Sequence, residues 1–235
     1  MQGDKFVVAE QHLEVAKKML EILQPRLTGS QGKYTITIAG ESGSGKSTTA
    51  AALFTILQQQ GLSCVLLQQD DYYIYPPITN DHTRRQNPEW RGLCEVNLTL
   101  LDQHLQEFLE GCSQIQKPLI VYAEDRIDHE IIDVEQANIL IVEGTFISLL
   151  KHVNARIFID RTYLDTRIDR RKRSRYQAEL DNFTEGILAH EHEIVSAHKA
   201  FADIIITQNY EVLTPPPAPP QRRGGTADRY GEKQT

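Results

Sequence analysis

The sequence predicts a three-layer α/β domain on a mainly parallel sheet, followed by a disordered C-terminal tail. Strand candidates alternate with helix candidates along the chain, and no internal repeat interrupts the alternation. The apolar, β-branched run at 34–39 continues through a glycine-rich turn into a helix candidate at 47–60. The 235 residues, of which 40% are hydrophobic and 24% charged, suffice for one large domain. We expect that domain at 1–212, its core at 33–207 and the proline-rich tail at 213–235.

Composition excludes several broad classes of function. The net charge of -7 argues against a nucleic-acid binder, which normally carries a basic face. No apolar run approaches the roughly 18 residues of a membrane span, and the N-terminus lacks the apolar core of a signal peptide. The three cysteines follow no metal-ligand spacing and predict free thiols. We therefore expect a cytoplasmic protein that binds neither nucleic acid nor membrane.

Apolar residues spaced three and four apart predict an N-terminal helix at 5–23, ended by Pro25 and Gly29. The stripe can pack on the sheet or pair with a second copy as a coiled coil. Packing is favoured, because fewer than three heptads make a weak coiled coil. A homo-oligomer stays open.

The turn at 40–48 carries the pattern G-x-x-x-x-G-K-S between a strand and a helix, a context that indicates a P-loop and a P-loop NTPase fold. Its glycines let backbone amides point inward as an anion nest, and the following helix adds its positive dipole end. Lys46 would contact the β- and γ-phosphates of ATP, and the Ser47 hydroxyl would ligate Mg²⁺. The predicted nucleotide-binding residues of the turn are Gly40, Ser42, Gly43, Ser44, Gly45, Lys46, Ser47 and Thr48.

Carboxylates follow two apolar strands. The strand at 63–69 continues into Asp70 and Asp71, where open α/β sheets bind ligands. A carboxylate there can accept a hydroxyl proton and help to hold a metal, although an ordinary turn after the strand is the alternative. The strand at 138–142 ends in Glu143, the Walker-B position, which would bind Mg²⁺ directly or through water.

The polar connection at 74–97 contains three prolines, and we expect it to form a flap over the acceptor substrate. Trp90 either stacks on an acceptor ring or packs on the core, with packing slightly favoured. Arg84 and Arg85 either hold an anionic substrate or are solvated. Further apolar patterns predict helices at 98–108 and 183–201, strands at 118–122, 156–160 and 203–207, and either a strand or a hairpin arm at 127–134.

A basic helix is expected after Thr162, which forms an N-terminal cap with Asp165. Arg167, Arg170 and Arg171 share one face of this helix by their spacing. Seven basic and two acidic residues lie between 161 and 175, and like charges so close repel each other unless an anion lies among them. Phosphate fits, and a solvated basic face is the alternative.

Four landmarks in order make the chain resemble the uridine kinase and phosphoribulokinase family of P-loop kinases. They are GESGSGKST at 40–48, QDDYY at 69–73, ILIVEGT at 139–145, and the pair DTRIDRR at 165–171 with ADIII at 202–206. The resemblance implies phosphate transfer from magnesium-ATP to a primary hydroxyl of a nucleoside or small sugar-like metabolite.

The resemblance also implies roles for individual residues. Asp70 would be the general base and a ligand on the metal side, while Ser47 and Glu143 would complete the Mg²⁺ site. Lys46 would hold the phosphates. The helical arginine lid, which closes over the triphosphate, would consist of Arg167, Arg170 and Arg171, with Arg170 in a catalytic role.

The acceptor half departs from the family pattern. The segment EWRGLCEVN at 89–97 lacks an Asp-His-Pro motif, and VYAEDRI at 121–127 has Asp125 near the place of a histidine. The candidate substrate residues are Asp71, Tyr72, Tyr73, Trp90, Tyr122 and Arg126. A P-loop regulatory ATPase or nucleotide switch is the alternative function, although the guanine-specificity motif N-K-x-D of a GTP switch is absent.

Overall fold

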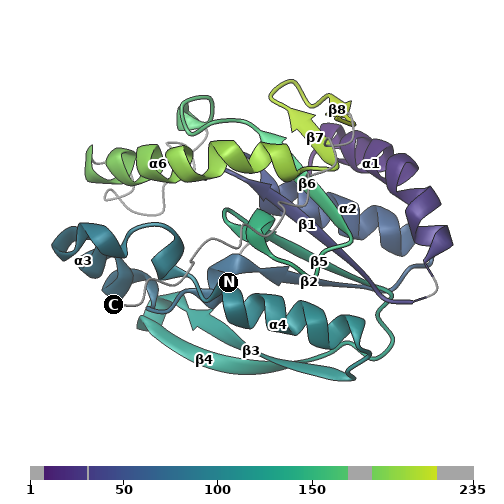
Figure 1. Cartoon of the computed structure of the whole chain (residues 1–235), viewed down its shortest axis with the longest axis horizontal. Helices are drawn as coiled ribbons and strands as arrows, with labels where there is room; N and C mark the ends of the chain where they lie inside the picture. The colour runs from purple at the N-terminus through teal and green to yellow at the C-terminus, as the bar shows by residue number, and fades with distance from the viewer. Residues whose placement is uncertain (1–7, 31, 169–181, 216–235) are drawn as a thin grey trace, which may run out of the picture.

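The computed structural model describes residues 8–30, 32–168 and 182–215. In these ranges a six-stranded sheet has the strands β1 (Tyr34–Gly40), β2 (Cys64–Gln68), β5 (Ile139–Gly144), β6 (Ala155–Asp160), β7 (Ile204–Thr207) and β8 (Val212–Leu213). Their order is β2-β5-β1-β6-β7-β8, and every neighbouring pair is parallel except β7 with β8 (Figure 1). The predicted α/β class and mainly parallel sheet are confirmed. β8 adds a short strand at the boundary with the predicted tail.

Five α-helices lie in the described ranges: α1 (Glu10–Gly29), α2 (Lys46–Gln59), α3 (Pro77–Gln86), α4 (Leu98–Leu109) and α6 (Asn182–Val195). Alternate residues of the central strands belong to two separate cores, as a sheet covered on both faces requires. Ile36 and Ile38 lie in the core with α1 and α2, whereas Ala39 lies in the core with α4. The result is the expected three-layer arrangement (Figure 1).

Helix α1 begins at Glu10 and extends further toward the C-terminus than predicted. It continues past Pro25, so the predicted end at 23 is wrong, whereas Gly29, the second predicted stop signal, is its last residue. Proline lacks the N–H that would bond back along the helix, so Pro25, which lies just before the last turn, removes one hydrogen bond near the end of the helix. The buried residues of α1 pack with α2, which supports the predicted packing of the apolar stripe inside the domain.

A second, two-stranded sheet is formed by β3 (Gln114–Val121) and β4 (Arg126–Asp133). The two strands are antiparallel and joined by a tight turn in which Asp125 has a φ of 45°. This confirms the hairpin-arm interpretation of 127–134. Buried residues of this hairpin share the core of α4, so both cover the same face of the main sheet (Figure 1).

The predicted flap contains helix α3, which the sequence analysis missed. The Asp125 carboxylate accepts hydrogen bonds from the backbone N–H groups of Ile78 at 2.7 Å and Thr79 at 3.1 Å. A side chain 46 residues away along the chain therefore caps the helix. The local sequence showed no capping residue, because the cap comes from the hairpin.

Parallel pairing places three functional segments at one edge of the sheet. Gln68 of β2 pairs in register with Glu143 of β5, and Ala39 of β1 pairs with Gly144. The P-loop, Glu143 and Asp70 therefore follow adjacent strand ends, which is where ligands bind in such sheets. In the described part of the chain, no helix combines the length and apolarity needed to span a bilayer.

Candidate active site

Two glycines shape the P-loop. Gly45 has a φ of 101°, a left-handed conformation that disfavours other residues, and it is the N-cap of α2. A Cβ atom on Gly40 would lie 2.9 Å from both the Ile159 carbonyl oxygen and the Ser44 hydroxyl. No side chain caps the first turn of α2, so its first backbone amides are left for an anion to bind.

Lys46, Ser47 and Glu143 meet at this edge. The Ser47 hydroxyl donates to Glu143 Oε1 at 2.9 Å, and Gln68 Nε2 donates to the same oxygen at 3.2 Å. The ammonium of Lys46 donates to the Glu41 carbonyl at 3.0 Å. Burial raises the pKa of Glu143, the nearby Asp70 carboxylate raises it further, and Lys46 opposes the rise. Asp70, half-buried in the 3₁₀ turn Gln69–Tyr72 after β2, therefore shares one electrostatic cluster with Glu143 and Lys46.

The donor set suits a magnesium ion. Mg²⁺ in kinases is held by one or two protein oxygens together with substrate phosphates and water. The Ser47 hydroxyl and the Glu143 carboxylate are adjacent oxygen donors, and a cation beside this buried carboxylate would offset the cost of its charge. Asp70 is the third predicted ligand of this set.

Asp71 and Tyr72 were predicted to contact the substrate, but both side chains are buried and bonded to other parts of the protein. Asp71 is buried, where it accepts hydrogen bonds from Lys117 Nζ at 2.7 Å and from the Ile120 backbone at 3.2 Å. Tyr72 is buried too, and its hydroxyl bonds His104 Nδ1 at 2.8 Å. Asp71 is thus committed to strand β3 and Tyr72 to helix α4, so neither side chain is available to a substrate.

The buried pair gives a first prediction. Replacing Lys117 with Met removes the cation that pairs with the buried Asp71 carboxylate, so we expect the free energy of unfolding to fall by about 3–5 kcal/mol. Chemical denaturation measures the loss. The matched control is Lys17→Met, which removes an exposed pair with Glu14 and should cost less than about 1 kcal/mol. Equal losses in the two variants would contradict the assignment, and adding Asp71→Leu to Lys117→Met should restore most of the stability.

Trp90 packs within the flap and belongs to neither core, so the favoured prediction of packing on the core is wrong in its location. Its indole N–H donates to Asn80 Oδ1 at 2.8 Å, and its ring lies 4.8 Å from that of Tyr75. Tyr73 is half-buried, with the Arg84 guanidinium 5.9 Å from its ring centre. Burial raises the pKa of Tyr73, and the Asp70 charge adds to the rise, so Tyr73 lies beside the predicted base.

The other two predicted substrate residues lie at the tip of the hairpin. Arg126 is exposed and forms ion pairs with Glu124 at 3.1 Å and Asp128 at 2.6 Å. Tyr122 begins the 3₁₀ turn Tyr122–Glu124, which is joined to the flap through Asp125. The structure therefore places both near the start of α3, and Arg126 is already paired with acidic neighbours.

The start of the predicted arginine lid contacts the P-loop. Thr162 and Asp165 form the expected cap, with the hydroxyl and backbone N–H of Thr162 donating to Asp165 Oδ2 at 2.8 and 2.9 Å. The Thr166 hydroxyl donates to the Ser42 carbonyl at 3.1 Å. Arg167 is about half exposed and lies 3.5 Å from Glu185 of α6. Arg170 and Arg171 lie outside the described residues.

Glu41 of the P-loop makes contacts that the sequence analysis did not predict. Its buried carboxylate accepts from the Tyr163 backbone N–H at 2.6 Å and bonds His192 Nδ1 at 2.7 Å. The P-loop is therefore joined to both the lid and α6. An acidic residue inside the glycine-rich turn was the visible signal, but its partners are more than 120 residues away.

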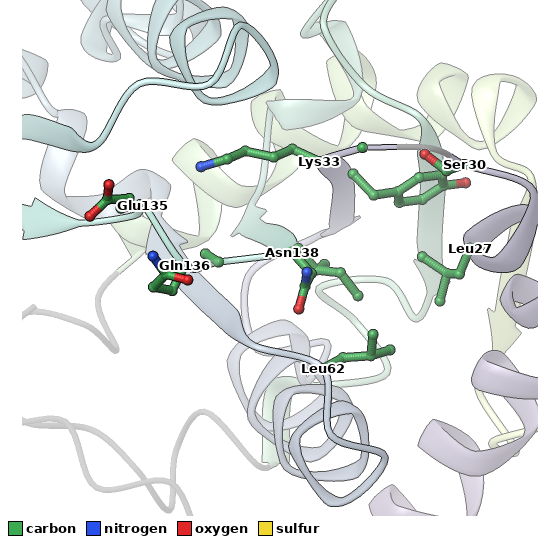
Figure 2. A pocket seen from close by; sticks show the side chains of 11 residues that line it. Leu27, Ser30, Lys33, Leu62, Glu135, Gln136 and Asn138 are labelled. Carbon is green, nitrogen blue, oxygen red and sulfur yellow. The ribbon is translucent and has the colours of Figure 1, made fainter.

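A hollow of about 480 Å³ lies at the opposite edge of the sheet, beside the amino ends of β1 and β5 (Figure 2). Leu27, Lys33 and Asn138 are among the residues that line it. The ammonium of Lys33 donates a hydrogen bond to the Val134 carbonyl at 2.6 Å and so stabilises the loop before β5. This hollow holds none of the predicted phosphate or metal residues, so its size does not make it the active site.

The comparisons agree with this geometry. Residues 35–209 match the model of the phosphoribulokinase/uridine kinase family. A uridine kinase of Bacillus mycoides is 31% identical over 191 residues, which cover 77% of this chain and 88% of that protein.

Solved structures share the fold. A possible uridine kinase from Bacillus stearothermophilus has a TM-score of 0.60 at 19% identity, covering 83% of this chain and 97% of that one. D-glycerate 3-kinase from Cryptococcus neoformans has a TM-score of 0.58 at 13% identity, covering 88% and 99%. The match of residues 35–209 to the family model and the 31% identity to a curated uridine kinase show that the chain belongs to the phosphoribulokinase/uridine kinase family of kinases.

Proposed function

We propose that this protein is a magnesium-dependent kinase that transfers the γ-phosphate of ATP to a hydroxyl group of a small molecule. The observation that carries the proposal is the hydrogen bond of the P-loop Ser47 to Glu143, in one electrostatic cluster with Lys46 and Asp70. A phosphate-binding loop, oxygen ligands for a metal and a carboxylate base are what phosphoryl transfer to an alcohol requires.

Each residue has a stated role in this proposal. The P-loop amides and Lys46 bind the phosphates, and Ser47 and Glu143 hold Mg²⁺ together with Asp70. When bound, the metal neutralises charge on the phosphates. Asp70 accepts the proton of the acceptor hydroxyl as the oxygen of that hydroxyl bonds to the γ-phosphorus, while the bond from the γ-phosphorus to the β–γ bridging oxygen breaks and ADP leaves. The arginines of the predicted lid, Arg167, Arg170 and Arg171, bind the triphosphate as it closes.

The names of the relatives guide the choice of acceptors. Curated relatives are uridine kinases, and one structural neighbour is a D-glycerate 3-kinase, so we expect a nucleoside or a sugar-like metabolite. The ring of Trp90 already packs on Tyr75 and its N–H is bonded to Asn80, so we do not expect Trp90 to be the main contact of a base. A uridine-like acceptor would therefore rest mainly on Tyr73 and on groups of the flap.

A coupled assay of ADP release tests the proposal. The assay compares uridine, ribose, glycerate, pantothenate and a pentose phosphate with a reaction that lacks any acceptor. We expect at least one neutral or anionic acceptor to raise the rate by about tenfold or more, because transfer to a positioned hydroxyl is faster than hydrolysis. Slow ADP release that no acceptor accelerates would contradict the kinase and favour a regulatory ATPase.

A further inference from the structure

A buried carboxylate of α6, Glu191, lies beside Arg84 of the flap. Glu191 is 7% exposed, and its Oε1 lies 4.0 Å from Nη2 of Arg84 in the flap. That separation is too long for a hydrogen bond. Within the described residues, no hydrogen bond to the Glu191 carboxylate is present, although buried polar groups normally have partners.

Arg84 is already neutralised by another residue. Its Nε donates to Glu95 Oε2 at 2.5 Å, and Glu95 also accepts from Asn80 Nδ2 at 2.6 Å and from the Gly92 backbone at 2.7 Å. Glu95 therefore holds the flap together through three hydrogen bonds. Arg84 lies between two carboxylates, so the anion-binding role that the sequence left open for it is not supported.

The electrostatics connect Glu191 to the reacting groups. Burial raises the pKa of Glu191 to about 7, while Arg84 and Lys46 oppose the rise and Glu95 and Asp70 add to it. Glu191 and Asp70 also both raise the pKa of Tyr73. Glu191 thus lies within electrostatic range of the predicted base and the P-loop lysine.

Helix α6 contacts both the P-loop and the flap. The neighbouring residue His192 bonds Glu41 of the P-loop at 2.7 Å. On the other side, α6 packs closely on the flap, because a Cβ atom on Gly92 would lie 2.9 Å from Ile194 Cδ1. The helix extends from the β7 end of the sheet toward α3 (Figure 1). Glu191 is therefore positioned between the nucleotide loop and the flap.

We propose that Glu191 determines acceptor specificity: its carboxylate accepts a hydrogen bond from a second hydroxyl of an uncharged polyhydroxy acceptor and repels acceptors that carry phosphate or carboxylate. The inference rests on the proposed function, and it names the class of acceptor. A hydroxyl of the acceptor supplies the partner that the described residues do not provide. An anionic acceptor would instead meet Glu191, Asp70 and a neutralised Arg84.

The test compares Glu191→Gln with wild type on a neutral acceptor and on its phosphorylated or carboxylated analogue. We expect the KM for the neutral acceptor to rise by about tenfold or more, since a charged hydrogen bond is replaced by a neutral one. The KM for ATP should stay unchanged, and kcat/KM for the anionic analogue should improve relative to the neutral one. The matched control is Glu193→Gln on the same helix, 77% exposed, which should change neither acceptor parameter.

A pH series separates a direct contact from a structural role. In wild type, the KM for the neutral acceptor should fall as pH rises from about 6 to about 8, because the carboxylate form increases through this range. The other groups that face Glu191 are Arg84, Glu95, Lys46, Asp70 and Tyr73. If any of these causes the pH dependence, it persists in Glu191→Gln, and the proposal is overturned.

The outcomes separate this inference from the proposed function. Absence of acceptor-dependent turnover in wild type would overturn both. An active kinase that prefers anionic acceptors, or whose acceptor KM is unchanged in Glu191→Gln, would overturn only the role of Glu191. Glu191→Asp, which keeps the charge on a shorter side chain, should retain the preference for neutral acceptors and provides a second variant if Gln impairs folding.

Discussion

Replacing Asp70 with Asn should lower kcat by about 10²–10⁴-fold and leave ATP binding nearly unchanged. The amide has the size of the carboxylate but cannot accept the proton of an acceptor hydroxyl. Asp70 follows β2 at the edge where the P-loop follows β1, and its charge acts on both Glu143 and Tyr73. We therefore propose Asp70 as the carboxylate that meets the acceptor hydroxyl next to the γ-phosphate.

Two measurements check this expectation. The rate of ADP release with the best acceptor gives kcat, and fluorescence titration with a labelled ATP analogue gives the affinity for the nucleotide. Asp133→Asn, an exposed residue at the end of β4, is the matched control and should keep wild-type kinetics. If Asp70→Asn retains kcat within about tenfold of wild type, another group is the base, since general-base removal normally costs more.

The Glu143→Gln variant should lose about 10²–10³-fold in kcat, because the metal site loses its buried carboxylate. Gln can still accept the hydrogen bond from Ser47, so the P-loop should keep its geometry. Raising the magnesium concentration should recover part of the activity. Glu193→Gln serves again as an exposed control that should behave as wild type.

Although Glu143→Gln should lose activity, it should make the metal-free protein more stable at high pH. Burial and the Asp70 charge raise the pKa of Glu143, with Lys46 opposing. The folded protein therefore binds this proton more tightly than the unfolded chain, and its stability falls as pH rises through the raised pKa. Gln has no such proton, so metal-free Glu143→Gln should unfold at a higher temperature than wild type at about pH 8, with the difference shrinking toward about pH 4.

Ligand addition completes this experiment. Magnesium and ATP together should raise the unfolding temperature of wild type, since a ligand that binds only the folded state stabilises it. The increase should be smaller in Glu143→Gln. If magnesium and ATP raise the unfolding temperature equally in the two proteins, Glu143 is not a metal ligand, whatever the kinetic result.

The strands and the P-loop could be predicted because their signals are local. The apolar run at 34–39, the glycines that permit left-handed backbone and the helix that follows are contiguous in the chain. Likewise, a carboxylate that closes an apolar run predicts that Glu143 lies at the carboxyl end of a buried strand. Each of these patterns depends on the backbone geometry and the burial of a single segment. They can therefore be recognised without knowing how the other segments pack.

Neighbouring residues with the same chemistry could not be told apart in this way. Asp70 and Asp71 are adjacent carboxylates after one strand, and only the structure shows that Asp71 is committed to Lys117, 46 residues away. Helix α3 was missed for a similar reason, since its capping residue belongs to the hairpin.

The sequence by itself determined the α/β class, the phosphate-binding turn and the family resemblance, because each is written in consecutive residues. Only the tertiary structure decided which carboxylates face the site and which are buried in packing. Glu191 is the clearest case: nothing near it along the chain marks it, and the packing of α6 on both the P-loop and the flap brings it within electrostatic range of Asp70. Side-chain environments depend on how distant elements pack, and that packing is a property of the whole chain.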